Sequence, residues 1–165
     1  GHLCAYVDGT NSFDPQSAFQ SSVSLERLLW TRCGGSLRRT MQAADALLQS
    51  GGFSLILLDL ADFDYGELNR IPQANWFRFQ RRIEKQPSAM IVLSRVPVTR
   101  TTARLVVSCR AAEAEWTGTV LPVLSRLRTE VFISRPMPRR SATVALKSAF
   151  WMEQGNVCRH TFSGP

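Results

Sequence analysis

Apolar residues occur along the chain in short runs that predict strands. The most continuous run extends from Ser54 to Leu60 and contains a single carboxylate, that of Asp59. A strand with one solvated face alternates apolar and polar residues, and this run does not. We therefore expect both of its faces to be buried in the middle of a parallel sheet. Three further runs predict strands of the same kind, at Leu3–Asp8, Leu28–Cys33 and Met90–Ser94.

Helical patterns separate these runs. Asp14 can cap a short helix that begins with a proline, and Ser36 can cap a second helix, in which apolar residues recur at helical spacing until Gly51. A third helix is predicted over about Ile71–Gln86, before Pro87. Alternation of strands and helices in this order indicates right-handed crossovers and a parallel sheet.

The pattern changes after residue 102. Arg104–Arg110, Arg128–Arg135 and Thr143–Ala149 alternate apolar and polar residues, which is typical of antiparallel strands. We expect them to extend the parallel sheet, with a short helix near Val120–Leu127 in the connection between the first two. The predicted fold is α/β, a three-layer sandwich with a parallel central sheet, helices on both faces and an antiparallel C-terminal extension.

Length and composition favour one globular domain. The chain has 165 residues, of which 1–150 are expected to form the core domain and 151–165 a polar tail. No apolar run approaches the roughly 18 residues that span a bilayer. We therefore expect no membrane association. The four cysteines are widely spaced and form no CxxC pair, so we expect reduced cysteines in a cytoplasmic protein and no zinc site. Because the chain starts within a predicted strand, we expect further residues upstream.

Positive charge is concentrated in the second half of the chain. Residues 1–94 carry nine basic and nine acidic residues, whereas residues 95–165 carry eleven basic and four acidic ones, which accounts for the net charge of +7. This asymmetry favours an acidic partner, either nucleic acid or protein. A GC-rich genome also produces an arginine-rich composition, so the abundance of arginine does not by itself indicate a binding function.

Two groups of basic residues are candidates for binding DNA or a partner. The first lies at helical spacing on one predicted helix face and consists of Arg78, Arg81, Arg82 and Lys85. The second lies in the basic second half and consists of Arg100, Arg104, Arg126, Arg128, Arg139 and Arg140. The alternative for the first group is an ordinary solvated helix face.

Three stretches resemble the core of the bacterial recombinase RecA: LCAYVDGTNSFDP, LLQSGGFSLILLDLAD and SAMIVLSR. The first is similar to the recombinase strand that ends in an acidic turn followed by Asp-Pro. The second is similar to the helix, glycine break and Walker B strand, and the third to the strand that ends in a nucleotide-sensing glutamine. The resemblance implies a RecA-like fold over most of residues 3–149.

The nucleotide site of that family is incomplete in this chain. Asp59 matches the Walker B acid, which helps to hold Mg²⁺, and Asp8 ends the first matched strand. Thr10 stands where the family has its catalytic glutamate, and Arg95 stands where it has the sensing glutamine. No Gly-x-x-x-x-Gly-Lys-Ser/Thr loop occurs in the 165 residues, so the phosphates lack their cradle unless that loop lies upstream. We interpret these four residues as a nucleotide-site remnant without metal or cofactor; in the alternative view, the two acids simply cap strand ends.

These departures resemble the ImuA family, recombinase-like accessory proteins of inducible mutagenesis in bacteria. The resemblance implies a non-catalytic adaptor in SOS-induced translesion DNA synthesis. Its implied partners are the Y-family polymerase-like subunit ImuB, RecA itself, and single-stranded or damaged DNA without sequence preference. Two other hypotheses remain: a DNA-dependent ATPase of the recombinase family with its phosphate loop upstream of residue 1, and a DNA-binding module unrelated to mutagenesis.

Overall fold

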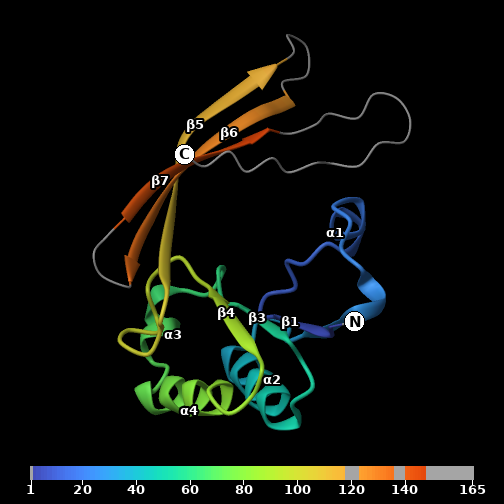
Figure 1. Cartoon of the computed structure of the whole chain (residues 1–165), viewed down its shortest axis with the longest axis vertical. Helices are drawn as coiled ribbons and strands as arrows, with labels where there is room; N and C mark the ends of the chain where they lie inside the picture. The colour runs from blue at the N-terminus through green and yellow to red at the C-terminus, as the bar shows by residue number, and fades with distance from the viewer. Residues whose placement is uncertain (1, 118–122, 136–139, 148–165) are drawn as a thin grey trace. The chain divides into compact units, whose positions relative to one another are not determined.

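The computed structural model describes residues 2–117, 123–135 and 140–147 (Figure 1). Its contacts divide the chain into two units, residues 1–103 and 104–165, where the sequence suggested a single core. The first unit contains, in order, β1 (Cys4–Asp8), α1 (Pro15–Gln20), a 3₁₀ turn (Leu25–Arg27), β2 (Leu28–Arg32), α2 (Leu37–Ser50), β3 (Leu55–Asp59), α3 (Tyr65–Asn69), α4 (Gln73–Ile83) and β4 (Ala89–Leu93). The second contains β5 (Val106–Thr117), β6 (Val123–Arg135) and β7 (Arg140–Lys147).

The first unit is built on a parallel sheet of four strands in the order β2-β1-β3-β4. All four strands correspond to the apolar runs, so the predicted parallel α/β architecture is confirmed. The predicted helix starts are confirmed as well. Asp14 accepts hydrogen bonds from the backbone N–H groups of residues 16 and 17, and Ser36 accepts one from Arg39. Gly51 ends α2 with a φ of 67°, a left-handed conformation that favours glycine.

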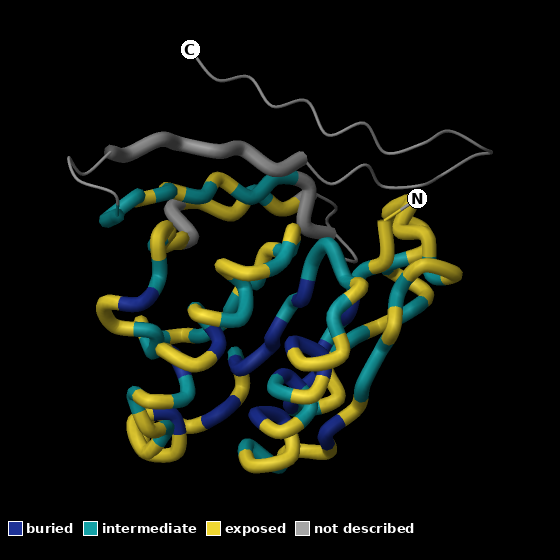
Figure 2. The backbone as a smooth tube through the Cα atoms, turned by 60° about the horizontal axis from the view of Figure 1, so that its bottom comes forward, coloured by how far each residue is buried: buried dark blue, intermediate teal, exposed yellow. Residues whose placement is uncertain are grey.

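The hydrophobic core lies between one face of this sheet and helices α2, α3 and α4. Alternate strand residues, such as Val7 of β1 and Leu58 of β3, point into it and are fully buried. The helices contribute Leu48, Leu68 and Phe79, among others. Figure 1 shows α2 and α4 along the same side of the sheet. Figure 2 shows the buried positions gathered inside this unit, between helix surfaces that are exposed.

The opposite face of the sheet differs from the prediction. Among the described residues, no helix buries a side chain against it, and α1 has no buried residue. Leu55 and Leu57 are only partly buried, and Ile91 and Leu93 are exposed. The expectation of helices on both faces, with both faces of the central strand buried, is therefore wrong for the described part of the chain. An unbroken apolar run shows that a strand is central, but it does not show that a second helical layer exists.

The second unit is an antiparallel sheet in the order β5-β6-β7. Its antiparallel character was predicted correctly, but it was expected to extend the parallel sheet. Its described strands pair with one another and form a sheet separate from the parallel one, which corrects the expected extension. The helix expected near Val120–Leu127 is also wrong, since Val123–Leu127 belong to β6. The described helices include none long and apolar enough to cross a membrane.

Candidate functional site

The carboxyl ends of β1 and β3 bring two acidic residues together. Asp8 and Asp59 are the last residues of their strands and are register partners in the sheet. Both are buried, with exposed fractions of 0% and 7%. Ligands of open parallel sheets bind beyond this edge. The two acids therefore lie at the position where a nucleotide site of such a fold would lie.

Asp8 uses both carboxylate oxygens to organise its surroundings. Oδ1 accepts a hydrogen bond from the backbone N–H of Ser12 at 2.9 Å. Oδ2 accepts one from the backbone N–H of Phe13 at 3.2 Å and one from the indole Nε1–H of Trp30 at 3.0 Å. Asp8 therefore fixes the loop after β1 and ties it to β2. Hydrogen bonds of this kind compensate the desolvation of a buried carboxylate.

Asp59 is held in a comparable way. Its Oδ1 accepts from the backbone N–H of Ala61 at 3.0 Å, and its Oδ2 accepts from the hydroxyls of Tyr6 at 2.6 Å and Ser12 at 3.4 Å. Burial, and then the hydrogen bond to Asp59, raise the pKa of the Tyr6 hydroxyl well above its ordinary value. Tyr6 is therefore a neutral donor throughout the physiological range.

Three aromatic side chains cover the two acids. The ring of Phe13 lies 4.7 Å from that of Tyr6 and 5.3 Å from that of Trp30, measured between centroids. The guanidinium of Arg32 lies 5.2 Å from the centre of the Trp30 ring. These contacts lie on the sheet face away from α2, because Tyr6 alternates with the core residues Ala5 and Val7, and Trp30 is its register partner.

Thr10 and Arg95 meet at a third acid, Asp62. The hydroxyl of Thr10 donates to Asp62 Oδ2 at 3.3 Å, and the Arg95 guanidinium contacts Asp62 Oδ1 at 2.9 Å. The pair is open to solvent, with side-chain exposures of 75% for Arg95 and 47% for Asp62. The structure therefore brings the remnant together at one sheet edge as two separate clusters, one buried and one exposed.

The buried cluster is held together by hydrogen bonds within the protein. The carboxylate oxygens of Asp8 and Asp59 all accept hydrogen bonds from the protein. Within the described ranges, no group of three or more acidic, histidine or cysteine residues is arranged to hold a metal ion. No described buried polar side-chain atom lacks a partner. The two acids thus connect the strand ends to the loops that follow them.

Gly9 lets the loop after β1 pass close to β3. A Cβ at this position would lie 2.5 Å from the backbone oxygen of Asp59 and 2.5 Å from a ring carbon of Phe63. Both distances are shorter than any ordinary contact, so a larger residue must displace either the strand end or the buried aromatic ring. Packing therefore requires a glycine directly after β1.

The basic stripe of α4 is split by an acid on α2. Asp45 Oδ1 contacts Arg78 Nε at 3.0 Å and an Arg82 terminal nitrogen at 2.7 Å, and Arg82 also donates to the Asp45 backbone oxygen at 3.0 Å. Gln49 donates to the other carboxylate oxygen. Arg81 and Lys85 are exposed instead. Two of the four predicted binding residues therefore attach α4 to α2, and two face solvent.

The basic residues of the second group differ in their surroundings. Arg126 and Arg128 of β6 form ion pairs with Glu115 and Glu113 of β5, at 2.9 and 2.8 Å. Arg100 and Arg104 are exposed; Arg139 and the side chain of Arg140 lie outside the described residues, as does the 151–165 tail. The described cysteines Cys4, Cys33 and Cys109 are free thiols.

Sequence reasoning missed the residues that complete these clusters. Tyr6 and Trp30 could have been found, because a period of two places them on the same sheet face as Asp8 once the strands are aligned. Asp45 and Asp62 carry no such signal, since their arginine partners lie 33 or 37 residues away in the sequence. Comparison with models of protein families and with curated proteins finds no match for this chain.

Proposed function

We propose that this chain is a non-catalytic, RecA-like adaptor in SOS-induced translesion DNA synthesis that binds the Y-family polymerase-like subunit ImuB. RecA is a second proposed partner. The observation that carries the non-catalytic part is the occupation of Asp8 and Asp59 by protein donors. The residues at the two other nucleotide positions, Thr10 and Arg95, are engaged with Asp62. A threonine hydroxyl is too weak a base to activate water at neutral pH.

ATP turnover by the full-length gene product tests this proposal against the ATPase alternative. We expect no hydrolysis above background with or without single-stranded DNA, because the acids that would hold Mg²⁺ are already used by the fold. An Asp59→Asn variant serves as the control, since it should leave any residual rate unchanged. DNA-stimulated hydrolysis that Asp59→Asn abolishes would contradict the adaptor and establish the ATPase.

Binding to ImuB tests the adaptor part directly. Purified ImuB should retain the full-length product on an affinity resin, and retention should survive moderate salt. For DNA we propose only weak, sequence-independent attraction, with a dissociation constant of roughly micromolar or weaker that rises steeply with salt. Absence of an ImuB complex together with tight DNA binding would favour the unrelated DNA-binding module.

A further inference from the structure

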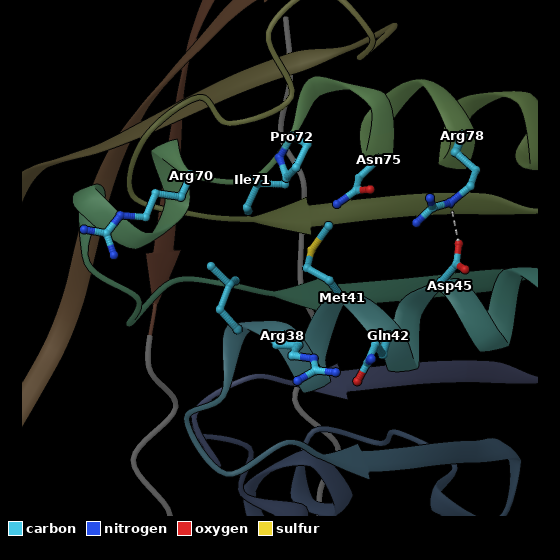
Figure 3. A pocket seen from close by; sticks show the side chains of 10 residues that line it. Arg38, Met41, Gln42, Asp45, Arg70, Ile71, Pro72, Asn75 and Arg78 are labelled. Carbon is cyan, nitrogen blue, oxygen red and sulfur yellow. Dashed lines mark hydrogen bonds and ion pairs between the residues drawn. The ribbon is translucent and has the colours of Figure 1, made fainter.

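A groove runs between α2 and the segment that joins α3 to α4 (Figure 3). Its volume is about 350 Å³, near the lower end of the range of roughly 300–1,000 Å³ that is usual for ligand pockets. Its apolar lining includes Leu37 and Met41 from α2, and Ile71 and Pro72 from the segment before α4. Figure 3 shows Met41 extending from α2 toward the segment that carries Ile71 and Pro72. The groove thus has room for one large side chain between apolar walls.

Arginines surround this apolar lining. Arg38 extends from α2, Arg70 from the end of α3 and Arg78 from α4, and all three are exposed. The one acid in the lining, Asp45, already contacts both Arg78 and Arg82. Within the described residues, neither Arg38 nor Arg70 forms an ion pair. The groove therefore presents uncompensated positive charge next to apolar surface.

We propose that this groove is a docking site for an acidic peptide segment of another protein, one that inserts a large apolar side chain between α2 and α4. Charge complementarity selects the carboxylates, and the apolar lining selects the anchor. Met41 suits this role because an unbranched thioether side chain adapts its shape to different anchors. The inference takes its biological setting from the proposed adaptor function, but its test does not use ImuB.

Nucleic acid fits the groove less well. Binding of single strands relies on aromatic side chains that stack on the bases, and none lines the groove. Contacts to phosphates alone would leave the apolar lining unused. A peptide that combines carboxylates with an apolar side chain uses both parts of the surface.

The test is fluorescence polarisation of the full chain with a fluorescein-labelled nine-residue peptide that contains three leucines among aspartates and glutamates. We expect a dissociation constant on the order of 100 µM or tighter, as is usual for a small interface. One control peptide replaces the acids by their amides, and another replaces the leucines by serine. Each control peptide should bind at least about tenfold more weakly, because the first keeps only the apolar side chains and the second keeps only the carboxylates.

Variants locate the binding. The pair Arg38→Glu and Arg70→Glu should weaken the acidic peptide at least about tenfold, and the milder pair Arg38→Gln and Arg70→Gln should weaken it about threefold or more. The matched control is the pair Arg81→Glu and Lys85→Glu, which makes the same charge change on an exposed face outside the groove lining. Circular dichroism checks that every variant is folded.

Four results would overturn the proposal: no binding of the acidic peptide, equal weakening by the control pair, equal binding of the serine peptide, or displacement of the peptide by an oligonucleotide whose own binding needs Arg38 and Arg70. The second and third of these indicate unspecific attraction, and the fourth assigns the groove to nucleic acid. If ImuB fails to bind while the peptide still binds, the proposed function fails and this inference stands. Retained ImuB binding without any peptide binding overturns this inference alone.

Discussion

Replacement of Asp8 by asparagine tests whether the buried acid serves the fold or a ligand. The substitution conserves shape, so no cavity forms, but one carboxylate oxygen becomes an NH₂ group that cannot accept. Turned toward Ser12, this group loses one hydrogen bond; turned toward Phe13 and Trp30, it loses two. We expect the first orientation, because the exposed Ser12 can turn its N–H to water.

The size of the effect follows from the bonds that remain. Loss of one bond to the loop costs about 1 kcal/mol, and the two bonds that stay weaken by roughly 1 kcal/mol each because the acceptor is no longer charged. The expected loss is therefore about 2–4 kcal/mol, a large part of the 5–15 kcal/mol that is usual for a domain. Trp30→Phe, which removes one donor and keeps a ring beside Phe13, should cost about 1–2 kcal/mol.

Urea unfolding followed by circular dichroism measures both variants and their combination. Because the two side chains share a hydrogen bond, the double variant should lose less than the sum of the single losses, by about 0.5 kcal/mol or more. An Asp8→Asn protein as stable as the wild type, or more stable, would refute the structural role. That outcome is typical of a carboxylate held ready for a ligand, whose charge destabilises the empty site.

Three more predictions concern the same unit. Gly9→Ala should destabilise it by about 1–3 kcal/mol in thermal unfolding, because the new Cβ meets the backbone of Asp59, whereas Gly66→Ala, with open space around it, should not. Burial and the hydrogen bond to Asp59 raise the pKa of the Tyr6 hydroxyl in the folded protein. The neutral hydroxyl therefore stabilises the fold fully below the ordinary tyrosine pKa of about 10, and this stabilisation is lost as the pH rises toward the folded-state pKa. Tyr6→Phe should therefore flatten the fall in unfolding free energy above about pH 10, and an equally steep fall would contradict this. Asp45→Asn should lower the free energy of unfolding in urea by about 1–2 kcal/mol, because two arginines of α4 lose their charged partner. An unchanged free energy of unfolding would show that the cost of desolvating these charges cancels their attraction.

Much of the first unit was predictable because its signals are local. The four parallel strands are short apolar runs, and the ends of α2 are marked by a serine cap and a glycine in the left-handed region. Asp8 and Asp59 could be placed at one edge, since parallel strands end on the same side of a sheet. Their hydrogen-bond partners come from β1, β2 and the loops after β1 and β3, and those on the strands are revealed only once the strands are aligned.

The second unit was harder to predict because alternation of apolar and polar residues indicates a strand without naming its neighbours. The stretch Val123–Leu127 places two apolar residues before Ser125 and Arg126, which suits a helix turn as well as a strand. Pairing with β5 decides in favour of the strand, and its ion pairs between Arg126 and Glu115 and between Arg128 and Glu113 join residues whose opposition depends on β-bulges. Sequence spacing does not reveal such bulges.

Charge counting along the sequence is a poor guide to where the fold presents unpaired positive charge, and the arginines show why. The excess of basic residues lies in the second half of the sequence, yet Arg126 and Arg128 pair with glutamates there. The first half is neutral in sum, but three of its nine acids are engaged within the fold, two of them buried at strand ends and another held between Arg78 and Arg82. A neutral stretch can therefore present uncompensated cations, because an acid that is already paired cannot screen a distant arginine. This reasoning directs the search for a partner surface to the groove beside α2.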